Sequence, residues 1–147
     1  MATILADTNI LLRLGDPNSP LHQLVNHAVN QLKTMGDIIC IVPQNLYEFY
    51  TVATRPSSAR GGLGLTPEQA EIEINRLQAL FNFLPDTADV FTEWLSLVSR
   101  YSVSGVQAHD ARLVAAMRVH SLPSLLTFNV ADFTRYDQID VLDPATI

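Results

Sequence analysis

The sequence has a single cysteine and few charged residues, and both shortages limit what it can form. One cysteine excludes an internal disulfide framework. Cys40 lies in the apolar run at residues 38–42, which predicts a buried strand thiol rather than a reactive one. Charged residues make up 16% of the 147 positions and hydrophobic residues 48%, a balance unlike that of a disordered chain. We expect one compact domain over residues 1–147.

Long hydrophobic runs are also missing. The apolar run at residues 38–42 is far too short to cross a bilayer. The first three residues lack the basic start of a signal peptide. We therefore expect a cytoplasmic protein with no membrane partner.

Positive charge is scarce, and this weighs against a nucleic-acid partner. The net charge is −6, whereas phosphate binding usually depends on clustered lysines and arginines. The objection weakens if several carboxylates converge and bind divalent cations, because the metal then inverts the local field. Eight of the nine basic residues are arginines, which suit bidentate phosphate contacts but are also common on ordinary surfaces. Charge alone decides nothing.

Apolar patterning alternates between strands and helices along the chain. Buried-strand patterns occur at residues 3–6, 38–42 and 124–128, and weaker ones at 83–85 and 139–142. Helical spacing of apolar residues occurs at 21–32, 43–53, 66–81, 87–98 and 108–120. Strands alternating with helices predict an α/β fold, a three-layer α/β/α sandwich with a central parallel sheet.

Polar residues follow two of the predicted strands. The first strand runs into Asp7, Thr8 and Asn9, and the strand near residue 125 runs into Thr127 and the stretch from 129 to 132. Ligands of open α/β sheets sit at the carboxyl ends of strands. The two clusters therefore indicate one site, although Asx turns and helix caps would use the same residues.

Asp110 is the most informative single residue. Leu113, Val114 and Met117 follow it at helical spacing, so Asp110 lies on the apolar stripe of its helix. Desolvation disfavours a carboxylate that points inward, so this position needs an explanation. Either it meets Asp7 and the residue 129–132 cluster around a hard cation, or it caps exposed N–H groups and complements the dipole in the first helical turn.

Other polar residues give weaker indications. The apolar stripe of the helix at 43–53 faces away from Glu48, so the helix alone predicts a solvated Glu48. Arg55, Arg60 and the glycines at 61, 62 and 64 form either a flexible phosphate-contacting loop or an ordinary surface loop. His109 either touches substrate or is a surface or helix-capping residue. The histidines at 22, 27, 109 and 120 form no zinc-ligand pattern.

Four segments together resemble the PIN domain, the fold of VapC-type toxins and related endoribonucleases. They are ADTNILLRL, LYEFYTVATRP, HDARLVAAM and LLTFNVADF, and the resemblance spans residues 4–143. It implies a metal-dependent ribonuclease that uses Mg²⁺ or Mn²⁺. It also implies an antitoxin partner and a homodimer, with dimer contacts expected on the helix of Phe91 and Leu95 or on that of Leu24 and Val25.

The resemblance assigns roles to individual residues. Asp7 and Asp110 would bind metal directly, Glu48 would bind metal or orient a water, and Asp132 would complete the acidic set with Asn129 as a polar neighbour. The choice between Asp132 and Asn129 stays open.

The hydroxyls of Thr8 and Thr127 match positions that in the family orient the carboxylates, with Asn9 supporting them. The resemblance does not specify the RNA that is cut or the number of metal ions.

Three other functions share part of this pattern. A response-regulator receiver would need paired acids and a late lysine, but the only lysine is Lys33, in a predicted helix. A haloacid-type phosphatase would need an aspartate where Asn9 stands. The serious alternative is a PIN fold that has lost activity and serves as a protein-binding module.

Overall fold

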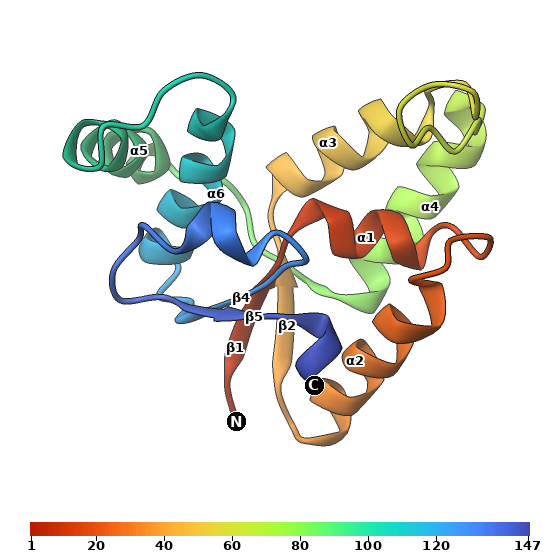
Figure 1. Cartoon of the computed structure of the whole chain (residues 1–147), viewed down its shortest axis with the longest axis horizontal. Coiled ribbons are helices and arrows are strands. Elements are labelled where there is room, and N and C mark those ends of the chain that lie inside the picture. Colours follow the sequence, from red (N-terminus) through yellow and green to blue (C-terminus); the bar gives the residue numbers. More distant parts are fainter.

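A five-stranded parallel sheet runs through the centre of the chain in a computed structural model that describes residues 1–147 (Figure 1). The strands are β1 (Thr3–Ala6), β2 (Ile38–Ile41), β3 (Asn82–Phe83), β4 (Ser124–Leu126) and β5 (Asp140–Leu142). Their order is β3-β2-β1-β4-β5, and every neighbouring pair is parallel. At the central strand, Leu5 pairs with Cys40 of β2 and with Leu125 of β4.

Six α-helices and two short 3₁₀ turns connect the strands. They are α1 (Thr8–Leu14), α2 (His22–Thr34), α3 (Pro43–Ala53), α4 (Pro67–Leu80), α5 (Ala88–Arg100), α6 (Gln107–Val119), η1 (Val130–Phe133) and η2 (Pro144–Thr146). The strand expected at residues 83–85 lies instead at Asn82–Phe83, since Pro85 has no N–H to donate. The strand expected at 124–128 ends at Leu126, where Thr127 turns into the candidate site.

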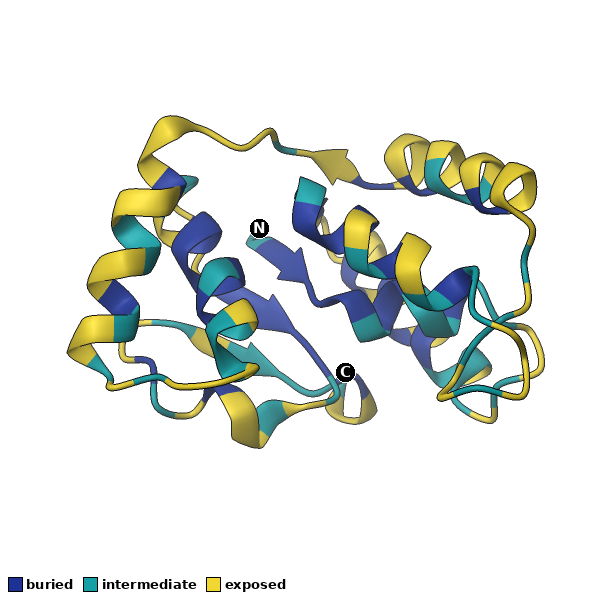
Figure 2. Cartoon of the chain, turned by 90° about the horizontal axis from the view of Figure 1, so that it is seen from above, coloured by how far each residue is buried: buried dark blue, intermediate teal, exposed yellow.

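Alternate residues of each strand face opposite helical layers. Ile4 and Ala6 pack into a core with side chains from α1 to α4, while Leu5 packs on the other side with α5 and α6. Figure 2 shows this arrangement, with buried surfaces on the strands and on the inward sides of the helices. The three-layer α/β/α sandwich predicted from the sequence is confirmed. Cys40 is buried at 1% exposure, as its apolar neighbours predicted.

Local signals set the helix ends. Thr66 and Gln69 form a reciprocal capping box at the start of α4, where Pro67 occupies the first position. Gly36 adopts φ +87° just beyond α2, in the left-handed region that glycine tolerates best. Thr87 precedes α5 in extended backbone, but its hydroxyl makes no capping hydrogen bond. No helix has the length and apolar character needed to cross a membrane.

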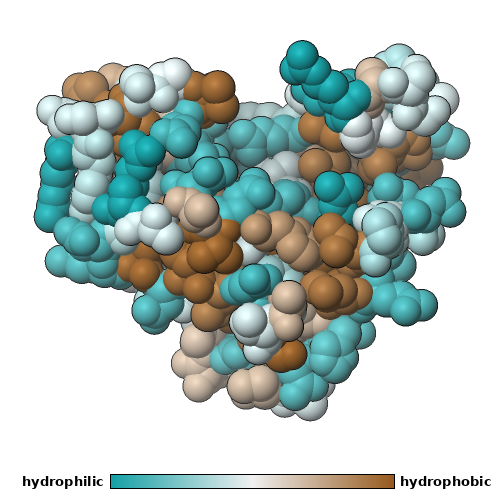
Figure 3. All heavy atoms as spheres, in the orientation of Figure 1, coloured by the Kyte–Doolittle hydropathy of each residue, from teal (hydrophilic) through white to brown (hydrophobic).

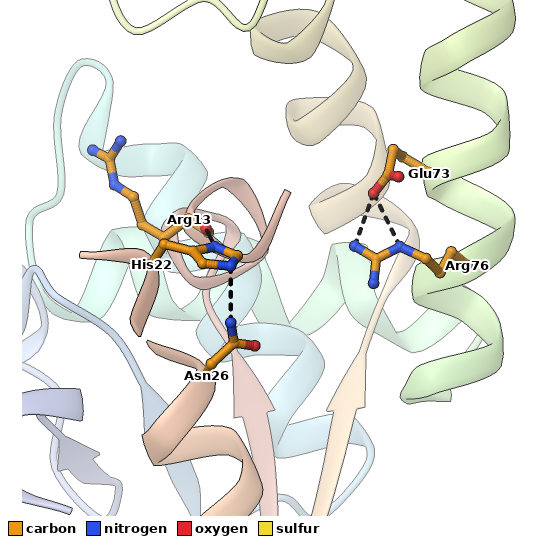
Figure 4. Close-up of polar contacts among 5 residues, drawn as sticks. All are labelled: Arg13, His22, Asn26, Glu73 and Arg76. Atoms are coloured by element: carbon orange, nitrogen blue, oxygen red, sulfur yellow. Dashed lines mark hydrogen bonds and ion pairs between the residues drawn. The ribbon is translucent and has the colours of Figure 1, made fainter. Parts of the chain in front are cut away.

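His22 joins the end of α1 to the start of α2 (Figure 4). Its Nδ1 lies 2.9 Å from the Arg13 carbonyl, which can only accept, so Nδ1 carries the proton. Its Nε2 then accepts from the Asn26 amide at 2.9 Å. The same view includes the ion pair of Arg76 with Glu73 on α4, at 2.9 Å. The ring of His22 is therefore occupied by structural contacts.

The two helices named as dimer faces differ in what they leave exposed. Val25 on α2 is fully buried and Leu24 partly buried, so their stripe contributes to the core. On α5, Val90 and Leu97 are buried, but Phe91 is 65% and Leu95 51% exposed. Only α5 therefore keeps large exposed apolar side chains among the residues expected to make a dimer contact.

Candidate metal centre

The candidate site lies where the direction of the chain crossovers reverses in the sheet. From β1 the chain goes to β2 on one side, whereas β4 pairs with β1 on the other. Asp7 directly follows β1 and Thr127 directly follows β4, and the Asp7 N–H donates to the Leu126 carbonyl at 2.9 Å. Ligand sites of parallel sheets form at this switch point, beyond the carboxyl ends of the strands.

A groove of about 520 Å³ opens above this point, between α3 and the start of α6. Figure 3 shows the molecule hollowed at the top, between the lobe that contains α5 and α6 and the lobe that contains α3 and α4. Eight residues expected from the sequence line the groove: Asp7, Thr8, Asn9, Glu48, Arg55, His109, Asp110 and Asn129. Residues that sequence reasoning missed also line it: Gln44, Tyr47, Thr51, Val52 and Arg112.

Asp7 has two distinct sets of contacts. Its Oδ1 accepts from the Thr8 N–H at 2.7 Å and so caps α1, as the cap interpretation anticipated. Its Oδ2 accepts from the Thr127 hydroxyl at 2.8 Å. Only 7% of the residue is exposed, and this burial raises the pKa of the Asp7 carboxyl. The Thr127 and Thr8 hydrogen bonds lower it in part, and the charges of Glu48 and Asp132 raise it.

The Thr127 hydroxyl is oriented by its other partners. Its Oγ1 accepts from the Asn129 N–H at 2.9 Å and lies 3.4 Å from Nδ2 of Asn9. These donors leave its proton to Asp7, because N–H groups cannot accept it. Asn9 Nδ2 also lies 3.4 Å from Asp7 Oδ2. The three supporting residues thus hold one carboxylate oxygen in place.

Glu48 corrects the expectation drawn from its helix alone. Instead of being solvated, it is half-buried, and its Oε1 accepts from the Thr8 hydroxyl at 2.7 Å. Its Oε2 lies 3.3 Å from Nε2 of Gln44. The helical wheel failed because the contact comes from α1, 40 residues away in sequence, and not from the core beneath α3. Both Asp7 and Glu48 therefore accept a threonine hydroxyl.

Two buried amides on α3 went unnoticed in the sequence. Asn45, fully buried, donates from Nδ2 to the Ala6 carbonyl at 3.0 Å and to the Thr8 hydroxyl oxygen at 3.3 Å. Gln44, 4% exposed, donates from Nε2 to the His109 carbonyl at 2.8 Å. These bonds fix α3 to the end of β1 and to the start of α6. Asn45 precedes Phe49 by one helical turn and so borders the apolar stripe, a signal that could have identified it, whereas Gln44 lies on the face of Glu48 and gave no such signal.

Asp110 faces the groove from the first turn of α6. Burial, followed by the charges of Asp7, Asp132 and Glu48, raises the pKa of its carboxyl to about 6, and His109 opposes the shift. The helix begins after Val106 without a side-chain cap, and no protein group donates a hydrogen bond to Asp110. No capping hydrogen bond therefore accounts for this carboxylate, and its place in the first turn leaves only the helix dipole as a structural role.

Asn129 and Asp132, the two candidates for the fourth position of the acidic set, lie differently in the structure. Asn129 lines the groove, whereas Asp132 is exposed on η1 and does not line it. The charge of Asp132 nevertheless raises the pKa of both Asp7 and Asp110. Asp132 is thus close enough to add negative charge, and Asn129 close enough to touch a ligand in the groove.

The basic residues expected to contact substrate are also separated. Arg55 and His109 line the groove. Arg60 is exposed in the loop between α3 and α4 and is not part of the groove wall. Arg112, which was not singled out in the sequence, lines the groove from α6.

The donor chemistry of the groove fits a hard, hydrated cation. No three acidic, histidine or cysteine side chains are arranged closely enough to enclose a metal ion by themselves. The acids supply oxygen only, and Oε1 of Gln44 is buried without a hydrogen-bond donor. Mg²⁺ prefers oxygen ligands and retains several waters, and such waters are donors for an unpaired acceptor. The residues present therefore fit Mg²⁺ or Mn²⁺.

Comparison with known proteins agrees with this geometry. The family model of the PIN domain matches residues 4–139. No curated protein matches the sequence.

Solved structures with the same fold include several toxin–antitoxin proteins. VapBC2 from Rickettsia felis, solved with a DNA fragment from its own promoter, superposes with a TM-score of 0.71 at 14% identity, over 96% of this chain and 98% of that one. FitAcB from Neisseria gonorrhoeae gives 0.68 at 20% identity, over 98% and 99%. VapC20 from Mycobacterium tuberculosis, a Sarcin-Ricin loop cleaving toxin, gives 0.58 at 18% identity, over 83% and 86%. At these identities the likeness concerns the fold, and together with the family match over residues 4–139 it shows that the chain belongs to the PIN domain family.

Proposed function

We propose that this chain is an endoribonuclease that hydrolyses RNA phosphodiester bonds with Mg²⁺ or Mn²⁺ held in the acidic groove. The observation that carries the proposal is the convergence of Asp7, Glu48 and Asp110 on one groove from β1, α3 and α6. Separate segments that bring carboxylates together against their mutual repulsion indicate a function that needs the charge.

The residues have distinct roles in this proposal. Asp7 and Asp110 would hold the ion, and Asp132 would add charge from η1. Glu48 would bind the ion or orient a water, since Thr8 and Gln44 fix both of its oxygens. When bound, a divalent ion lowers the pKa of a coordinated water and stabilises charge on the phosphate. Arg55 and His109, at the groove wall, would contact the phosphate backbone.

The test is cleavage of structured and unstructured RNA by the purified chain with and without metal. Cleavage is expected with Mg²⁺ or Mn²⁺, to stop with chelator, and to be poor with Zn²⁺. Asp7→Asn keeps the size of a side chain that caps α1 but removes its charge, so it should abolish cleavage while the fold persists. Equal cleavage by wild type and Asp7→Asn under Mg²⁺ contradicts the proposal.

The biological role proposed is that of the toxin in a toxin–antitoxin pair. Its support is the likeness to VapBC2 and to a toxin–antitoxin complex from Klebsiella pneumoniae, which covers 96% of this chain. An antitoxin would be encoded beside the gene, as a small DNA-binding protein. Absence of any such reading frame, together with no growth inhibition on expression, counts against this role.

A homodimer belongs to the same proposal. The exposed Leu95 on α5 supports a contact between two copies on this helix. Sedimentation at micromolar concentrations should show a dimer that Leu95→Ala weakens. A monomer at every concentration removes the dimer and leaves the nuclease proposal standing.

A further inference from the structure

A second cavity lies beside the acidic groove, between α5 and the start of α6. It measures about 470 Å³, within the roughly 300–1,000 Å³ of small-ligand sites. We call it the aromatic pocket, and among its lining residues are Asp86, Val90, Phe91, Trp94, His109 and Arg112. The proposed hydrolysis of RNA assigns nothing to its α5 side. The two helices pack along each other on the left of Figure 1.

Two aromatic side chains give the pocket its character. The ring centroids of Phe91 and Trp94 are 6.0 Å apart, with planes inclined by 32°. The Trp94 indole N–H donates to the Ala108 carbonyl at 2.8 Å, so α6 fixes the ring and its only polar atom is satisfied. Phe91 is 65% exposed although it is large and apolar. Such rings are surfaces on which unstacked bases of single-stranded RNA stack.

The aromatic pocket and the acidic groove share a wall. His109 and Arg112 line both cavities, and Asp110, between these two residues in the sequence of α6, lines the acidic groove. Arg112 is positioned by an ion pair with Asp86 at 3.3 Å, and both side chains remain partly exposed. A guanidinium at the junction suits a phosphate oxygen. A nucleotide whose phosphate lies at the groove therefore has an aromatic surface within reach of its base.

We propose that the aromatic pocket binds an unstacked base of the RNA substrate, next to the phosphate that lies in the acidic groove. This inference rests on the proposed nuclease function, whose substrate site it extends. Charge favours RNA over a second copy of the chain, because the pocket shares His109 and Arg112 with the groove proposed to hold the cation, and Arg112 and Asp86 add charged groups to its wall. Those polar groups can also contact the edge of the base.

Trp94 is the only tryptophan of the chain, which makes the test direct. Wild type is mixed rapidly with a short single-stranded RNA in Mg²⁺, and indole emission is followed before cleavage. A saturable decrease in emission is expected. Phe91→Ala should weaken it and raise KM roughly tenfold, the usual effect of losing one stacking partner. Ile72→Ala is the matched control, because it removes an equally exposed apolar side chain from α4, outside the pocket, and it should bind RNA like wild type.

A second measurement locates the base. An abasic nucleotide is placed at each position of the RNA in turn. In wild type, one position beside the cleaved bond should lose roughly tenfold in kcat/KM. In Phe91→Ala that penalty should disappear, because the partner of the missing base is already gone. Phe91 is exposed, so Phe91→Ala should keep the wild-type melting temperature within a few degrees.

The outcomes separate the two proposals. If wild type cleaves RNA but emission does not change and Phe91→Ala keeps the wild-type KM, the pocket inference is wrong and the nuclease stands. If no metal supports cleavage while saturable quenching persists and is lost in Phe91→Ala, the pocket stands and the nuclease is wrong. If Phe91→Ala and Leu95→Ala weaken RNA binding equally and both dissociate a dimer, α5 is a contact between copies and the inference is overturned.

Discussion

The Thr8 hydroxyl donates a 2.7 Å hydrogen bond to Oε1 of Glu48 and thereby ties the start of α1 to the middle of α3. The same oxygen accepts from Asn45, whose amide is fixed on the Ala6 carbonyl. Since the amide can only donate to it, the hydroxyl proton is directed to the carboxylate. Thr8 therefore couples the position of Glu48 to the end of the central strand.

Thr8→Val should reduce RNA cleavage and stability together. Valine keeps the volume but leaves Glu48 and Asn45 without this partner, at a cost of about 1–2 kcal/mol in the free energy of unfolding. We expect kcat to fall about tenfold or more with little change in KM, and Thr8→Ser to restore it. Thr51→Val is the control, because its hydroxyl lines the groove but bonds only to the Tyr47 carbonyl. An equal loss in both variants contradicts a specific role for Thr8.

Asp110→Asn should stabilise the metal-free protein while abolishing cleavage. The substitution removes one of the charges that repel each other across the groove, and a gain of about 1 kcal/mol corresponds to about 2–4 °C. The stabilisation that Mg²⁺ gives by binding the native state should shrink. Melts of both proteins with EDTA and with millimolar Mg²⁺ measure this. A lower melting temperature without metal, and an unchanged Mg²⁺ shift, would favour an inactive binding module.

The stability of the metal-free protein should fall as pH rises from about 4 to 6. The folded pKa of Asp110, about 6, lies above the ordinary value of 3.8, so in this window the native state holds a proton that the unfolded chain releases. The contribution is present below about pH 4 and is lost above the folded pKa. We expect on the order of 1 kcal/mol, because solvent screens a half-buried group. Urea titrations of wild type and Asp110→Asn in EDTA, repeated across this pH range, give the free energy of unfolding at each pH. The difference between the two proteins in the slope of that free energy against pH isolates the contribution of Asp110.

The fourth acidic position can be assigned by a matched pair of variants. Asp132→Asn removes a charge that acts on Asp7 and Asp110, so it should weaken Mg²⁺ binding. Asn129→Ala removes a neutral amide and should weaken it less. Its backbone N–H, which donates to Thr127, is retained. Mg²⁺ titrations followed by melting temperature compare them, and a larger loss in Asn129→Ala reverses the assignment.

Arg55 and Arg60 should differ in their effect on substrate binding. Arg55 lines the groove, whereas Arg60 is exposed in the loop outside it. Arg55→Gln should raise KM for RNA several-fold and reduce its salt dependence, while Arg60→Gln should change neither. Initial rates at two salt concentrations test this. Equal effects would mean that the loop closes over the substrate.

The sequence by itself determined the layered fold and part of the site. Alternating strand and helix patterns predicted the parallel sheet because each pattern reports which side of an element is buried. The placement of Asp110 on an apolar stripe predicted its inward position, and the strand ends predicted Asp7 beside Thr127.

Only the tertiary structure decided how the remaining side chains meet. Glu48 lies opposite the apolar stripe of α3. It is nevertheless part of the site, because the start of α1 passes over that face of α3 and Thr8 donates a hydrogen bond to Glu48. Gln44, Asn45 and Arg112 join the site through contacts with segments far away in sequence or through a shared wall. Periodicity describes the face that a helix presents to the core. It carries no information about which distant segment passes over the opposite face, and that crossing is set by how the layers pack.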